Sequence, residues 1–118
     1  MGSKEGAFVR AITFNGAFCG VIGVYTKEAE YAHAAELGYW VAQEYWNKGI
    51  ASKAVTKFTE LVFATTDFQR LYAVVSAPNQ ASIQVMHKAG YSLEGILRKS
   101  VQKQGQFYDE HLFARLRV

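Results

Sequence analysis

A short segment in the middle of the chain combines residue types that bind anions. Lys48 and Gly49 follow a β-rich run, and Ala51 and Ser52 would lie in the first turn of a predicted helix. The first backbone N–H groups of a helix have no intrahelical acceptor, and the helix dipole adds partial positive charge there. A ligand can approach the backbone of Gly49 closely, because glycine has no Cβ. The segment therefore predicts a phosphate-binding loop, to which Lys48 adds charge and Ser52 a hydroxyl.

Two well-known phosphate loops do not match this segment. A P-loop needs two spaced glycines followed by Lys-Ser or Lys-Thr, whereas here Lys48 precedes Gly49. A dinucleotide-binding loop needs three glycines, and this segment contains one. Short glycine motifs are weak evidence on their own. An ordinary helix start therefore remains an equal alternative for these residues.

The surrounding sequence predicts the elements that would position this loop. Runs of β-forming residues predict strands, and apolar residues at three- and four-residue steps predict helices. Asn15-Gly16 suits a tight hairpin turn, since both residue types tolerate positive φ. The predicted strands cover residues 7–14, 17–26, 36–43, 70–76, 91–98 and 107–115, a polar loop follows residue 98, and the predicted helices cover 49–66 and 80–89. This order predicts a mixed α/β fold, a twisted mixed sheet with helices on both faces, in which the 36–43 and 70–76 strands are parallel.

Length and composition exclude several classes of protein. The 118 residues predict a single domain over residues 1–118, and 50% hydrophobic residues suffice for a packed core. Cys19 is the only cysteine, which excludes an internal disulfide and favours a cytoplasmic, reducing environment; the three histidines lack metal-ligand spacing, so no metal is expected. No apolar run resembles a signal peptide or a membrane span. The net charge of +3 comes from scattered basic residues, which favours anionic ligands but not nucleic acid.

Three longer blocks of sequence occur in a recognisable order. They are ELGYWVAQEYWNKGIASKAV from Glu36, APNQASIQVMHKAGYSLEGILRKS from Ala77, and GQFYDEHLFARL from Gly105. Together they resemble the GNAT superfamily of acetyl-CoA-dependent N-acetyltransferases, and within it the RimJ/RimL-like branch. The resemblance implies a GNAT-like fold that uses acetyl-CoA as cosubstrate and moves the acetyl group directly to an amine, either a protein N-terminus or a small amine. It also favours the phosphate-binding interpretation of the central loop.

The resemblance implies which residues hold the cosubstrate. Backbone N–H groups of the loop from Trp46 to Ser52 would bind the pyrophosphate of coenzyme A. The strand before this loop would pair with the pantetheine arm through Val41 and Gln43, like an added β-strand. Asn79 would contact the cofactor as well, with helix capping as its alternative role. The implied cofactor-binding residues are Val41, Gln43, Trp46, Lys48, Gly49, Ile50, Ala51, Ser52, Asn79 and Ser82.

The same resemblance implies catalytic and substrate-side residues. Ser82 would bind the cofactor or protonate the leaving thiolate, with solvation of the first helical turn as its alternative. Met86 stands where many members have a tyrosine, and a thioether cannot donate a proton. Glu36 is the candidate general base, directly or through water, because it opens the central strand near where the substrate should enter; a solvated strand end is its alternative role. Tyr108 and Asp109 would shape the substrate side, with structural support as an equal alternative.

The sequence departs from the GNAT pattern at its N-terminus. It begins at what resembles the second strand of the family, so the usual first strand and N-terminal helices, which often form a wall of the acceptor site, are not found. The 7–14 strand would then lie at a sheet edge, which favours a homodimer or a partner that covers it. Two alternatives to an active N-acetyltransferase remain: a non-catalytic module that binds coenzyme A or acetyl-CoA, and a protein-interaction domain.

Overall fold

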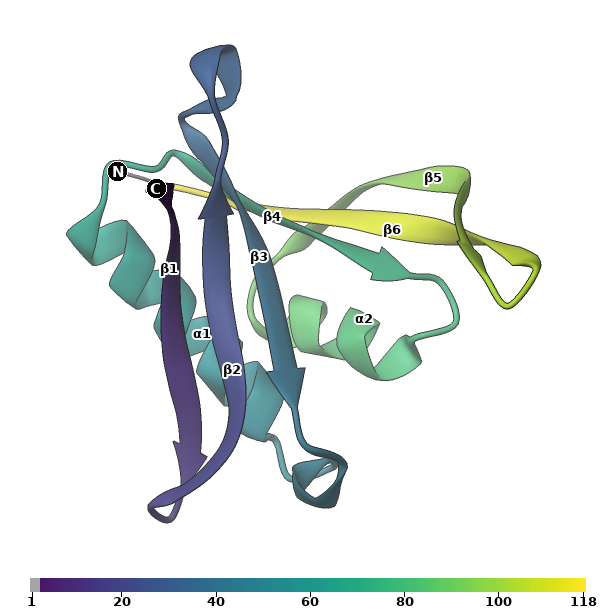
Figure 1. Ribbon diagram of the computed structural model, residues 1–118, viewed down its shortest axis with the longest axis horizontal. Helices are drawn as coiled ribbons and strands as arrows, with labels where there is room; N and C mark the ends of the chain where they lie inside the picture. The colour runs from purple at the N-terminus through teal and green to yellow at the C-terminus, as the bar shows by residue number, and fades with distance from the viewer. Residues whose placement is uncertain (1–2) are drawn as a thin grey trace.

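A computed structural model describes residues 3–118 and contains six strands and two α-helices in this range. The strands are β1 (Ser3–Phe14), β2 (Ala17–Thr26), β3 (Ala34–Val41), β4 (Arg70–Ser76), β5 (Ser92–Lys103) and β6 (Gln106–Leu116); the α-helices are α1 (Ile50–Thr65) and α2 (Gln80–Lys88), and the 3-10 helices are η1 (Ala29–Tyr31) and η2 (Gln43–Tyr45). The predicted mixed α/β class and the order of elements are confirmed (Figure 1). Neither α-helix in this range is long and apolar enough to cross a membrane.

The six strands form one mixed sheet in the order β1-β2-β3-β4-β6-β5. Strands β3 and β4 are parallel, as predicted, but they pair only over Ala34 to Glu36 and Arg70 to Tyr72. Beyond these residues they separate: Figure 1 shows β3 running steeply downward while β4 runs to the right. Within residues 3–118, the second half of β3 therefore has no partner strand on its β4 side.

Both α-helices cover the same face of the sheet. The ring of Phe8 on β1 packs on Phe58 of α1 at a centroid distance of 5.5 Å, and Phe113 on β6 packs on His87 of α2 at 5.3 Å. The strand register places Phe8 and Phe113 on one face, so the prediction of helices on both faces is wrong. The reason is that both crossovers, β3–α1–β4 and β4–α2–β5, advance in the same direction across the sheet. Because both crossovers are right-handed, their helices lie on the same face.

The hydrophobic core lies between these helices and the sheet. Phe113, Leu71 and Met86 are among its largest fully buried side chains. Cys19 is 1% exposed and belongs to this core. The hydroxyls of Thr59 and Tyr91 lie 2.7 Å apart within this core, and burial raises the pKa of Tyr91 to about 12. This buried pair joins α1 to the chain that follows α2.

The structure tests the predicted connections of the two long hairpins, β1–β2 and β5–β6. The predicted turn at Asn15-Gly16 is confirmed, with φ angles of 52° and 81°. The prediction of a polar loop after residue 98 is wrong, because β5 continues to Lys103. The β5–β6 pairing is irregular between Leu97 and Val101. There the Lys99 N–H donates to Asp109 Oδ1 on β6 at 2.9 Å, and this hydrogen bond holds the polar segment after residue 98 in the hairpin. Strand β1 lies at the sheet edge, and its self-association stays a prediction.

Candidate functional site

A cleft of about 620 Å³ opens where β3 and β4 separate. Its walls come from the end of β3, the loop that precedes α1, the first turn of α1, and α2. The lining residues are Tyr39, Trp40, Val41, Tyr45, Trp46, Asn47, Gly49, Ile50, Ala51, Ser52, Asn79, Gln80, Ala81, Ser82, Gln84, Val85 and Lys88. The fold therefore brings together the implied cofactor-binding residues, except Gln43 and Lys48.

The first turn of α1 supplies free backbone donors to this cleft. Gly49 is the N-cap, with φ 74° and ψ 8°, and no side chain caps the helix. The first intrahelical bond runs from the Lys53 N–H to the Gly49 carbonyl at 3.2 Å. The N–H groups of Ile50, Ala51 and Ser52 therefore have no intrahelical acceptor, and no acidic residue in this turn offsets the helix dipole. This helix start is suited to bind an anion.

A second hollow of about 260 Å³ adjoins the cleft and is strongly basic. It is lined by Ser52, Lys53, Thr56, Lys57 and Lys88, of which Ser52 and Lys88 also border the cleft. No ion pair joins these lysines to another described side chain. Their uncompensated charge favours a ligand with several negative groups at this end of the cleft.

The edge of β3 that faces the cleft can pair with an extended ligand. The Ala42 N–H donates to β2 at 2.8 Å, and the alternation of backbone groups along a strand turns those of Val41 and Tyr39 to the opposite side. Trp46 Nε1 donates to the Val41 carbonyl at 2.7 Å, so the indole both fixes the loop and occupies one acceptor of this edge. The remaining edge groups are available for an amide-containing ligand arm.

Helix α2 contributes a capped N-terminus and a hydroxyl pair. Asn79 Oδ1 accepts the Ser82 N–H at 3.1 Å, which confirms the capping role of Asn79. Ser82 Oγ lies 2.9 Å from the hydroxyl of Tyr39 on β3. Burial raises the pKa of Tyr39 above its ordinary value, and the hydrogen bond to Ser82 offsets part of this rise. Tyr39 was not among the candidate site residues, although the strand period places it on the same side of β3 as Val41.

Gln43 and Lys48 do not line the cleft. Strand β3 ends at Val41, and the carbonyl of Gln43 accepts the Trp46 N–H at 3.0 Å in the 3-10 helix η2. The prediction that the strand continues to Gln43 is therefore wrong, because this turn redirects the chain before that residue. Lys48 is exposed within the loop.

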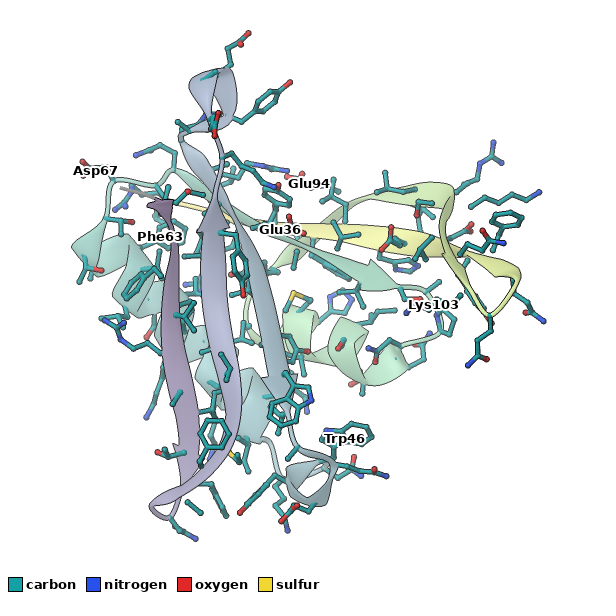
Figure 2. The ribbon with its side chains drawn as sticks, in the orientation of Figure 1. Glu36, Trp46, Phe63, Asp67, Glu94 and Lys103 are labelled. Atoms are coloured by element: carbon teal, nitrogen blue, oxygen red, sulfur yellow. The ribbon has the colours of Figure 1, made fainter. Side chains whose placement is uncertain are left out.

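Glu36 does not line the cleft either. It lies at the point where β3 and β4 separate, well away from Trp46 along β3 (Figure 2). Its carboxylate forms an ion pair with Lys27 at 3.2 Å, and its side chain is 39% exposed. Hydrogen bonds to Tyr72 and Glu36 raise the pKa of Lys27. Because it is separated from Tyr39 by three positions on a pleated strand, Glu36 points to the face of the sheet opposite the helices.

Tyr108 and Asp109 also lie outside the cleft, on β6. The hydroxyl of Tyr108 donates to Gln106 Oε1 at 3.2 Å, and Asp109 Oδ1 accepts the Lys99 N–H at 2.9 Å. Both contacts support the β5–β6 hairpin, which is the structural alternative for this pair. In the part of the chain that the structure describes, no three His, Cys, Asp or Glu side chains are grouped to hold a metal ion.

The sequence has relatives among known proteins. It matches the acetyltransferase (GNAT) domain over residues 2–92. It is 33% identical over 95 residues to the uncharacterized N-acetyltransferase YoaA of Bacillus subtilis (strain 168). This alignment covers 80% of this chain and 53% of YoaA. It is 30% identical over 81 residues to the spermidine N(1)-acetyltransferase of Escherichia coli (strain K12). This alignment covers 68% of this chain and 44% of that protein. The chain thus spans about half the length of the curated relatives it matches.

Solved structures share this fold. The ribosomal L7/L12 α-N-protein acetyltransferase RimL, in complex with coenzyme A, superposes with a TM-score of 0.86 at 24% identity, over 96% of this chain and 63% of RimL. The microcin C7 self-immunity acetyltransferase MccE, in complex with acetyl-CoA and AMP, has a TM-score of 0.84 at 24% identity, over 96% and 62%. At this level of identity, the likeness establishes the fold.

Proposed function

Because this chain belongs to the acetyltransferase (GNAT) domain family, we propose that it binds acetyl-CoA in the cleft between β3 and β4 and transfers the acetyl group directly to an amine. The observation that carries this proposal is the juxtaposition of two sets of free backbone groups. The uncapped start of α1 suits the pyrophosphate, and the unpaired edge of β3 suits the amide-containing pantetheine arm. One cleft therefore offers partners to both parts of coenzyme A.

The proposed chemistry is a direct transfer. The free amine attacks the thioester carbonyl, and a backbone N–H of the β3 segment donates to the oxyanion of the tetrahedral intermediate. The C–S bond then breaks, and Ser82 protonates the thiolate. Glu36 accepts the proton that the amine loses, directly or through water, from the face of the sheet opposite the helices. Separate faces would keep the acceptor and the cosubstrate apart until they meet where the strands separate.

The acceptor is proposed only as an amine, a protein N-terminus or a small molecule. Relatives and structural neighbours named for their substrates include an L-amino acid N-acetyltransferase, a spermidine N(1)-acetyltransferase and a ribosomal-protein-S5-alanine acetyltransferase. These names cover L-amino acids, a polyamine and an alanine of a ribosomal protein. They support an amine acceptor and favour none of the three kinds.

Acetyl-CoA is expected to stabilise the folded chain. A ligand at about 100 times its dissociation constant adds about 2.7 kcal/mol to the free energy of unfolding, which thermal unfolding detects. Thiol release is then measured with L-amino acids, spermidine and a peptide with an N-terminal alanine. The absence of any stabilisation would contradict the proposal. Stabilisation without amine-dependent thiol release would instead support the second candidate, a non-catalytic module that binds coenzyme A.

Replacing Glu36 by glutamine is expected to lower kcat by about 100-fold or more while leaving acetyl-CoA affinity unchanged, because general-base catalysis contributes factors of that size. The measurement is amine-dependent thiol release at saturating acetyl-CoA. Lys27→Met is the matched control, since it removes the same ion pair but keeps the carboxylate. Equal losses of kcat in the two variants would show that the ion pair matters and that Glu36 is not the base.

A further inference from the structure

A pair of hydroxyls spans the cleft from one wall to the other. Tyr39 belongs to β3 and Ser82 to the first turns of α2, and their oxygens lie 2.9 Å apart. Both residues line the cleft, so a ligand bound there can reach the pair. Either oxygen can donate in this contact, and the direction of donation decides what the serine hydroxyl does next.

The surroundings favour Tyr39 as the donor. A phenol is a stronger acid than an aliphatic alcohol, so it is the better hydrogen-bond donor of the two. Because burial raises the pKa of Tyr39, its hydroxyl keeps its proton at neutral pH. The Tyr39 side chain is partly buried and packs against the core, which includes its same-side neighbours Leu37 and Val41. The Asn79 cap holds Ser82 through its backbone N–H. With both residues held, a bond donated by Tyr39 leaves the hydrogen of Ser82 free to point elsewhere.

The place of this pair in the cleft suggests the target of that hydrogen. Along β3, Tyr39 lies between Glu36, the last residue paired with β4, and Val41, which is next to the α1 loop. A thioester of coenzyme A with its phosphates at the start of α1 would extend along β3 toward Tyr39. The sulfur, at the far end of the pantetheine arm from the phosphates, would then be near the hydroxyl pair.

We propose that Tyr39 is a positioning residue that donates its hydroxyl hydrogen to Ser82 Oγ and thereby directs the Ser82 O–H toward the sulfur of coenzyme A. This inference rests on the proposed function. When the C–S bond breaks, its electron pair stays on sulfur, and the sulfur takes the Ser82 proton. The serine oxygen takes the proton of Tyr39, and the phenolate regains one from solvent, to which Glu36 releases the proton that it took from the amine. The chain of hydrogen bonds strengthens each donor in it.

Bound coenzyme A itself reports this arrangement, without an acceptor. The ultraviolet absorbance of the thiolate is followed against pH for coenzyme A saturating the wild-type chain, Tyr39→Phe, Ser82→Ala and the double variant. Ser82→Ala is expected to raise the pH of half-ionisation by about one unit, since the thiolate loses a charge-assisted hydrogen bond. Tyr39→Phe is expected to raise it by about half a unit or more. The double variant should shift no further than Ser82→Ala, because Tyr39 acts through Ser82.

Tyr91→Phe is the matched control for loss of a tyrosine hydroxyl. It breaks the other hydroxyl pair, with Thr59 in the core, and should leave the bound thiol unchanged. An unchanged thiol in a folded Tyr39→Phe chain that still binds coenzyme A would overturn the inference and leave the proposed function standing. Additive shifts in the double variant would also overturn it. Failure of the wild-type chain to bind coenzyme A would overturn the proposed function and this inference with it.

Discussion

Replacing Gly49 by alanine is expected to weaken acetyl-CoA binding by more than about 10-fold and to lower folding stability by about 1–2 kcal/mol. The φ angle of 74° is left-handed, and a residue with a Cβ costs roughly 1–2 kcal/mol in that conformation. Apart from its chain neighbours, the added methyl would meet no protein atom within 4 Å, and Gly49 lines the cleft. Relief of the strain would turn the N–H groups of the first helical turn away from the ligand. Isothermal titration with acetyl-CoA and urea unfolding measure the two effects.

Gly105→Ala separates binding from backbone strain. Gly105 has φ 80°, and an added Cβ there also meets nothing within 4 Å, but the residue lies in the β5–β6 turn and not in the cleft. It should lose about the same stability as Gly49→Ala and keep full affinity. Equal affinity in both variants would mean that the loop at Gly49 does not hold the ligand.

Replacing Gly20 by alanine is expected to destabilise the protein by about 3 kcal/mol or more, a large part of a typical total of about 5–15 kcal/mol. The added Cβ would collide with the carbonyl oxygen of Trp40 and would lie 3.0 Å from the Cα of Val41. Both are backbone atoms of β3, so no change of rotamer relieves the collision. Strand β3 must move, and with it the wall of the cleft that ends at Val41. Urea unfolding measures the loss.

Gly95→Ala is the control for this substitution. Gly95 also lies in a strand, β5, but an added Cβ there meets nothing within 4 Å. Because glycine inside a strand is less stable than alanine by about 0.5–1 kcal/mol, this change should be neutral or slightly stabilising. A Gly20→Ala chain as stable as Gly95→Ala would contradict the close packing of β2 on β3.

Much of the fold could be predicted because its signals are local. Strand β4 has the predicted bounds of 70–76, and the turn at Asn15-Gly16 has the predicted positive φ angles. The end of β5 could not be predicted in this way. Its polar residues lie in a strand because Asp109, ten positions later, accepts the Lys99 N–H across the hairpin. The common face of the two helices likewise follows from the direction of the crossovers across the sheet, which no single segment encodes.

Part of the candidate site could also be predicted from the sequence, and part could not. The helix start from Gly49 to Ser52 was predicted from residue type and position, whereas Asn79 and Ser82 were implied by the family resemblance, and all of these residues line the cleft. The local pattern around Gln43 was continuous with a strand, but the 3-10 turn that ends β3 excludes it from the cleft wall. The signal that marks Tyr39 is its contact with a residue 43 positions away.

The residues near Gly49 were sufficient to indicate a helix start with free N–H groups, since these groups and the helix dipole depend on a few consecutive residues, and the family resemblance was needed to favour phosphate binding there. The order of strands and helices was sufficient to indicate the fold class. Only the folded chain shows that β3 and β4 separate after Glu36, which makes a cleft beside that helix start. The same separation sets Tyr39 against Ser82 inside the cleft and leaves Glu36 on the other face. These placements depend on strand pairing and helix packing between distant segments, where contacts are decided by the whole core.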